Sequence, residues 1–249
     1  MYDMKWFVVG LMVAGCASAG KGNSIIGGLS DAGVEDPGQP DAAQDDARND
    51  PVSDALTQQL TLTQTRRTTI TDGNSFACMS SSGATAQNSY YRVFALDDFD
   101  ITTPLHVTQV DFGIERADAG SNATAQPATI KIGTYGANPV GTTLDPAQIV
   151  PNTEVAVMIP DGRRTRMTVP IEVDAAPGSR LIVELNLPDG TNTDSHFLIG
   201  SNADGERQPG YLSATAAGCQ LDVPTTMQSV AASLMRDDAD ILLTVTGTL

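Results

Sequence analysis

Short stretches in which hydrophobic and polar residues alternate recur along this chain from residue 56 onward. In HVTQVDFGIE (106–115), Val110, Phe112 and Ile114 alternate with polar residues or glycine. A period of two places one face of a β-strand in the core and the other in water. Similar stretches, rich in β-branched and aromatic residues, predict about nine strands: 60–70, 90–96, 106–115, 128–135, 153–159, 165–173, 180–187, 195–200 and 240–247.

Turn-forming residues separate several of these strands. Residues 160–162 (PDG), 177–178 (PG) and 188–190 (PDG) combine the fixed φ of proline with a permissive glycine. Short connections without a helical stripe predict an all-β fold, an antiparallel two-sheet sandwich that is jelly-roll-like. Residues 213–236 fit this pattern least, and we expect a short helix or a long loop there.

Parts of this region resemble a β-sandwich module that is attached to large secreted bacterial proteins, including proteases. The resemblance covers roughly residues 76 to 249 and is carried by YYRVFALDDFDI, LHVTQVDFGIE, APGSRLIVELNLPDG and FLIGSNADGE, followed by GYLSA and Cys219. These are strand and turn patterns rather than catalytic signatures. The resemblance therefore implies a sandwich fold and carries over no site residue.

Residues 1–15 have the layout of an export signal. The uncharged run from Trp6 to Gly15 follows Lys5 and is shorter than the roughly 20 residues of a membrane-spanning helix. The stretch VAGC (13–16) resembles the lipobox of bacterial lipoproteins, which implies that Cys16 is acylated and becomes the new N-terminus. An ordinary secretory signal cut near residues 17–19 is the alternative.

Residues 16–55 differ from the rest of the chain in composition. From residue 17 on, this segment contains no aromatic residue, and its two basic and eight acidic residues give a net charge of −6. Such a segment cannot bury enough apolar surface to fold. We therefore expect a disordered acidic linker between a lipidated Cys16 and a β-sandwich domain at 56–249; an acidic tail that binds a partner is the alternative.

The formal net charge of the whole chain is −16, and its sequence shows no run of Lys and Arg. We expect no nucleic-acid partner, because phosphates require basic clusters. Contact with the membrane is expected through the lipid anchor. In some bacterial lipoproteins an aspartate directly after the acylated cysteine retains the protein at the inner membrane. This chain has Ala17 at that position, so the resemblance favours a location at the outer membrane of a bacterial cell envelope.

Candidate catalytic residues are few. His106 and His196 are the only imidazoles, and Asp194-Ser195-His196 places an acid, a nucleophile and a base together in sequence. Adjacent residues of a strand point to opposite faces, and no G-x-S-x-G stretch occurs. We therefore expect no enzyme, while a hydrolase with an unrecognised site stays open as an alternative.

Two groups of aspartates are candidate calcium ligands. Oxygen atoms on loops suit calcium, but neither group matches an EF-hand, and solvated turn residues are the simpler interpretation. No cofactor is expected, and structural calcium stays open; zinc is disfavoured because C-x-x-C and H-x-x-x-H are absent. The candidate metal ligands are Asp97, Asp98, Asp100, Asp237, Asp238 and Asp240.

Four tyrosines are the candidate ligand-binding residues: Tyr90, Tyr91, Tyr135 and Tyr211. Tyr90 and Tyr91 are adjacent in a predicted strand, so one of them is predicted to be exposed and to offer a platform for a sugar. Buried rings with wet hydroxyls are the alternative. We expect a non-catalytic recognition or adhesion domain with a protein or glycan ligand, and a carbohydrate-binding module is the alternative.

Cys78 and Cys219 remain once Cys16 is assigned to the lipid. Each lies in a stretch of polar and small residues, FACMSSSG and ATAAGCQL, rather than inside an apolar strand. An exported chain meets an oxidising compartment. The sequence therefore predicts a Cys78–Cys219 disulfide, with two separate thiols as the alternative.

Overall fold

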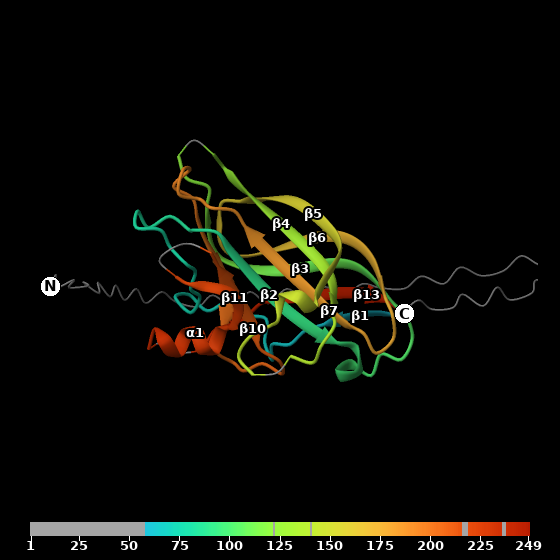
Figure 1. Cartoon of the computed structure of the whole chain (residues 1–249). Helices are drawn as coiled ribbons and strands as arrows, with labels where there is room; N and C mark the ends of the chain where they lie inside the picture. Colours follow the sequence, from blue (N-terminus) through green and yellow to red (C-terminus); the bar gives the residue numbers. More distant parts are fainter. Residues whose placement is uncertain (1–57, 122, 140, 216–218, 236–237) are drawn as a thin grey trace, which may run out of the picture. The chain divides into compact units, whose positions relative to one another are not determined.

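Two antiparallel sheets form a sandwich-like arrangement in this protein (Figure 1). The computed structural model describes residues 58–121, 123–139, 141–215, 219–235 and 238–249, which belong to the compact unit Asp54–Leu249. The predicted all-β, antiparallel two-sheet sandwich is confirmed. The predicted signal at 1–15, Cys16, the linker to residue 55 and Asp237 lie outside the described residues.

The first sheet has the order β1-β13-β3-β6, and β8 also pairs with β3. Its strands are β1 (Gln59–Leu62), β3 (Leu105–Asp118), β6 (Gly162–Ala175), β8 (His196–Ile199) and β13 (Leu243–Thr248). The second sheet has the order β11-β10-β2-β7-β4-β5. Its strands are β2 (Asn88–Ala95), β4 (Ala125–Tyr135), β5 (Ile149–Pro160), β7 (Arg180–Leu187), β10 (Gly210–Ala214) and β11 (Leu221–Thr226).

The remaining elements are short. A two-residue strand β9 (Ser201–Asn202) pairs with β12 (Asp240–Ile241). Two 3₁₀ turns, η1 (Leu96–Phe99) and η2 (Pro146–Gln148), and one helix, α1 (Met227–Ser233), connect strands. Within the described residues, no helix is both long and apolar enough to cross a membrane.

The described residues form thirteen strands, more than the nine predicted. Every predicted range contains a strand, but the range 60–70 is strand only as far as Leu62, and 240–247 is broken at Leu242. The strands without a predicted counterpart, β9, β10 and β11, are two to six residues long. Such lengths are too short for alternation to be recognised, whereas the short helix expected within 213–236 is present as α1.

Three backbone segments meet where 240–247 is broken. The Gly113 N–H donates to the Leu242 carbonyl (2.9 Å), the Leu242 N–H to the Gly200 carbonyl (2.8 Å), and the Gly200 N–H to the Gly113 carbonyl (2.7 Å). A Cβ atom on Gly200 would lie 2.7 Å from the Gly113 Cα. Glycine is required here because the two backbones approach so closely.

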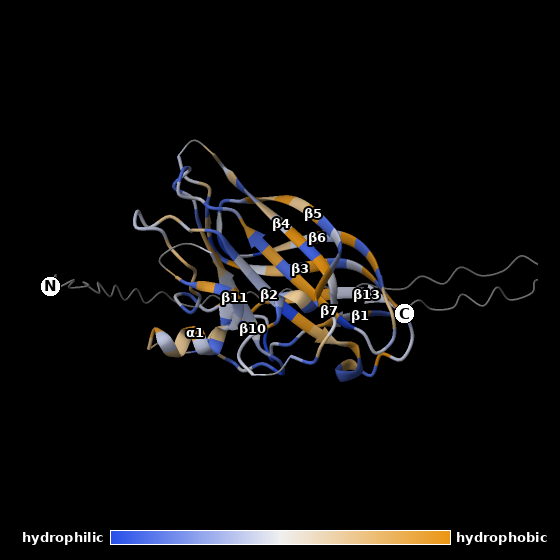
Figure 2. Cartoon of the chain, in the orientation of Figure 1, coloured by the Kyte–Doolittle hydropathy of each residue, from blue (hydrophilic) through white to orange (hydrophobic). Residues whose placement is uncertain are grey.

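The main core lies between the two sheets. Val110, Phe112 and Ile114 are buried, as the alternation in β3 predicts, and they join Tyr90 and Phe94 of β2 in one cluster. Figure 2 shows hydrophobic and hydrophilic segments alternating along the strands, whereas the connecting loops are largely hydrophilic. The core therefore follows from the period of two in the sequence.

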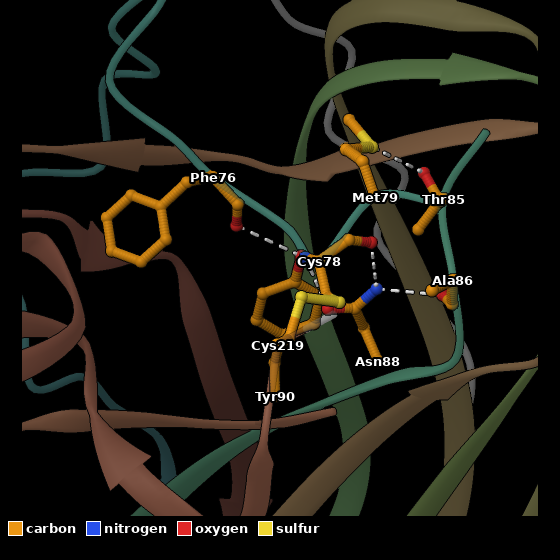
Figure 3. The surroundings of a disulfide bond; sticks show 8 residues. All are labelled: Phe76, Cys78, Met79, Thr85, Ala86, Asn88, Tyr90 and Cys219. Atoms are coloured by element: carbon orange, nitrogen blue, oxygen red, sulfur yellow. Dashed lines mark hydrogen bonds between the residues drawn. A yellow bond between two sulfur atoms is a disulfide. The ribbon is translucent and has the colours of Figure 1, made fainter. Parts of the chain in front are cut away.

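The predicted Cys78–Cys219 disulfide is present and joins the segment before β2 to the segment before β11 (Figure 3). The two Cα atoms are 6.0 Å apart, and the residues are separated by 141 positions. Asn88 fixes the first of these segments, because its side chain accepts from the Cys78 N–H (2.9 Å) and donates to the Cys78 (3.0 Å) and Ala86 (2.8 Å) carbonyls. The disulfide is thus anchored at Cys78, which is buried and hydrogen-bonded to the Asn88 side chain.

Candidate functional site

A polar cleft of about 430 Å³ is formed by the loop between β9 and β10, the start of α1 and β12. Its polar lining includes three acids and two carboxamides. We call it the carboxylate cleft and define it by Glu206, Gln208, Gln228, Asp238 and Asp240.

Arg92 lies behind this cleft on β2, at an inward position between Tyr90 and Phe94. Its side chain is fully buried and donates to the carbonyls of Gln208 (2.5 Å) and Ile241 (2.6 Å). These bonds tie the loop before β10 and the end of β12 to the second sheet. Arg92 therefore holds the wall of the carboxylate cleft in place.

Glu206 pairs with this buried guanidinium. Its Oε2 lies 2.7 Å from an Arg92 terminal nitrogen, and its Oε1 accepts from the Gly210 N–H (3.2 Å). Burial raises the pKa of Glu206 to about 7; the charge of Arg92 opposes this rise, and the charge of Asp240 adds to it. Both carboxylate oxygens thus face partners within the fold.

Asp240 is the second carboxylate near Arg92. It accepts from the Gly205 N–H (2.6 Å), and burial raises its pKa. Two acids therefore face one guanidinium, with Asp238 adding a third negative charge at the cleft. Arg207 also lines the cleft, so three carboxyl groups are opposed by two guanidinium groups, and the cleft keeps a small excess of negative charge.

A neighbouring cleft of about 250 Å³ shares Gln208 with the first. Asp97, Asp98 and Tyr211 line it, so three residues predicted as separate candidates lie around one hollow. The Gln208 side chain donates to Asp98 (3.3 Å). Asp100 does not line this cleft and instead ends η1 in a left-handed conformation with φ 57°.

The prediction that either Tyr90 or Tyr91 is exposed is wrong. Tyr90 is 0% exposed in the core between the sheets, while Tyr91 is 8% exposed on the other face of the second sheet. There Tyr91 packs with Tyr135, Tyr211 and Leu144, a residue of the connection between β4 and β5. Because that connection covers the face, none of the four tyrosines offers an exposed platform.

The predicted string Asp194-Ser195-His196 does not assemble as a catalytic triad. The His196 Nε2 is 3.9 Å from Asp194, and the Ser195 hydroxyl accepts from the Thr193 hydroxyl (3.2 Å). No hydrogen bond joins Ser195 to His196 among the described side chains. The geometry gives this string no means of activating the serine.

His106 lies at the opposite end of β3 from the strand that carries His196. Its two ring nitrogens are 2.6 Å from Glu172 and 2.7 Å from Asp174. The hydrogen bond that His106 donates to Asp174 raises the pKa of His106, and Glu172 adds to the effect. This exposed cluster is an ion-pair network on the first sheet.

In the described part of the chain, no group of three or more His, Cys, Asp or Glu side chains is arranged to hold a metal ion. Asp238 and Asp240 line the carboxylate cleft, and Asp97 and Asp98 line its neighbour. Structural calcium stays a prediction, since the rest of the second aspartate group lies outside the described residues.

The comparisons with protein-family models, curated proteins and solved structures give no match for this chain. Sequence reasoning missed Arg92 and Glu206. A signal for Arg92 is present, because a charged residue occupies an inward position between two aromatic residues in YYRVFAL. Glu206 lies in a loop and carries no such signal.

Proposed function

We propose that this chain is a lipid-anchored protein of the bacterial outer membrane whose sandwich domain is a non-catalytic binding module. The export layout of residues 1–15 and the lipobox-like VAGC support the anchor. The carboxylate cleft supports the binding role. Its ligand is a polar group that presents hydrogen-bond donors, such as a basic side chain of a protein partner.

One observation carries this proposal: the cleft wall is fixed by a buried guanidinium that faces two acids. Rigid loops with a small excess of negative charge suit recognition. Proton transfer is less well supported, because both oxygens of Glu206 are held by Arg92 and the Gly210 N–H. The buried tyrosines leave the carbohydrate alternative without exposed aromatic rings.

Capture of envelope components by the immobilised full chain, beside a glycan array, tests the binding role. The variant Gln228→Ala/Asp238→Asn changes the cleft without touching Arg92, and Glu154→Gln on β5 is a control away from the cleft. We expect the wild-type chain and the control to capture the same protein and the cleft variant to lose it. Equal capture by all three would contradict the cleft, and a hit confined to the glycan array would favour the carbohydrate alternative.

The anchor has its own test. Metabolic labelling with a fatty acid should mark the wild-type chain and leave Cys16→Ser unlabelled, because the thiol is the acyl acceptor. Equal labelling of both chains would contradict the lipoprotein proposal and would leave the proposed binding role untouched.

A further inference from the structure

The fold gathers arginines that are far apart in sequence. The arginine patch consists of Arg66 and Arg67, after β1, and Arg163, Arg164 and Arg166, in β6. Arg166 donates to the Thr68 carbonyl (2.8 Å), and Arg164 lies 2.7 Å from Asp72. About a hundred positions separate the two segments in the sequence. These two contacts bring the β6 arginines beside the loop that carries Arg66 and Arg67.

The acids near the patch do not neutralise it. Arg67 pairs with Asp204 (3.8 Å) and Arg164 with Asp72 (2.7 Å), whereas no ion pair involves the other three arginines in the described structure. The hydrogen bond from Arg164 lowers the pKa of Asp72, and the positive charge of Arg163 lowers it further. The five arginines are exposed, on a chain whose net charge is −16. The patch is thus a local reversal of the overall charge.

The backbone beneath the patch is fixed. The Asn202 side chain donates to the carbonyls of Arg67 (3.0 Å) and Thr69 (3.0 Å), and the Arg66 N–H donates to the Gly205 carbonyl (3.0 Å). Protection of the β6 edge by charge would explain the arginines of that strand. It does not explain Arg66 and Arg67, because these belong to the loop after β1.

We propose that the arginine patch binds an anionic polysaccharide. The planar guanidinium fork matches carboxylate, sulfate and phosphate groups, and this patch contains arginine without lysine. The large hydrophobic side chains exposed in the described structure include no aromatic ring and lie outside the patch. The patch thus offers no ring on which nucleic-acid bases could stack, and no apolar side chain to insert into a bilayer.

Arg66 lies against Gly205 at the margin of the carboxylate cleft, whereas Arg163, Arg164 and Arg166 lie on β6, away from its lining. The two proposals are tested with different probes and different variants, so each can fail alone. The probe is heparin, a sulfated polysaccharide, and binding to the full chain in nonionic detergent is measured by calorimetry at about 50 mM salt. The variant Arg66→Gln/Arg163→Gln removes two arginines for which the structure shows no side-chain hydrogen bond or ion pair. A control variant, Lys131→Gln/Arg180→Gln, removes two cations elsewhere, on β4 and β7, of which Lys131 is paired with Glu184 (3.4 Å).

We expect the wild-type chain and the control to bind heparin alike and the patch variant to bind about fivefold more weakly, because two exposed ion pairs are lost. Reversal of charge in Arg66→Glu/Arg163→Glu should abolish binding, with an unchanged thermal midpoint showing that the fold persists. Neutral dextran should not bind. Equal weakening in the control, no heparin binding by the wild-type chain, or tighter binding to duplex DNA or phosphatidylglycerol vesicles would each overturn the proposal.

Discussion

The stability of the sandwich should depend on the protonation of Glu206. The folded state raises the pKa of this carboxyl from its ordinary value of 4.5 to about 7. A carboxyl with a higher pKa in the folded state binds its proton more tightly there, so acidification stabilises the fold. The difference corresponds to about 3 kcal/mol, gained as the pH falls from about 8 to about 5 and lost again as it rises through the folded pKa.

Urea unfolding at a series of pH values measures this dependence, with Glu206→Gln as the perturbed chain. The glutamine keeps an oxygen for the Gly210 N–H but cannot titrate. The free energy of unfolding of the wild-type chain should rise on acidification, and the variant should lose most of that rise. His106 and Asp240 also have raised pKa values, which give the same sign in both chains. Because the charge of Asp240 acts on Glu206, the difference between the chains reports Glu206 together with its coupling to Asp240. Parallel pH profiles for the two chains would refute the reasoning.

Three further changes should lower the free energy of unfolding, again measured in urea. Arg92→Met should cost about 3–5 kcal/mol, because Glu206 would stay buried without its counter-charge; a loss below 1 kcal/mol would contradict a role as anchor. Cys219→Ser should cost up to about 5 kcal/mol by release of the long loop, and unchanged stability would show that the bond constrains little. Gly200→Ala should cost more than about 2 kcal/mol, because its Cβ meets backbone atoms; the nearby Gly205 is unsuitable as a control because its φ is +95°.

Much of the fold follows from local pattern. The alternation around Phe112 identifies β3 and its buried face, and the count of cysteines identifies the Cys78–Cys219 pair. The strand β3 and the disulfide can be predicted because a few neighbouring residues, or the number of cysteines, carry the information. The pairing of the short strands β9 and β12 cannot be predicted in this way, because it depends on how Gly200 and Leu242 meet Gly113.

The candidate sites depend on tertiary proximity. Tyr91 follows the strand rule and points away from the core, but the connection between β4 and β5 covers it. Glu206 becomes part of a site only because Arg92, on β2 of the second sheet, reaches the loop between β9 and β10. The arginine patch joins residues from β6 and the loop after β1, so no window of sequence contains it.

The strand order of the first sheet determines when this sheet can be completed during folding. β13, the final strand, lies between β1 and β3, so the first strand finds its neighbour only when residues 243–248 are present. A ribosome or a secretion channel that releases the chain from its N-terminus delivers this central strand last. The sheet cannot be completed around the gap, because pairings so distant in sequence form only after a long loop has closed. The first sheet therefore remains incomplete until residues 243–248 are available for pairing with both β1 and β3.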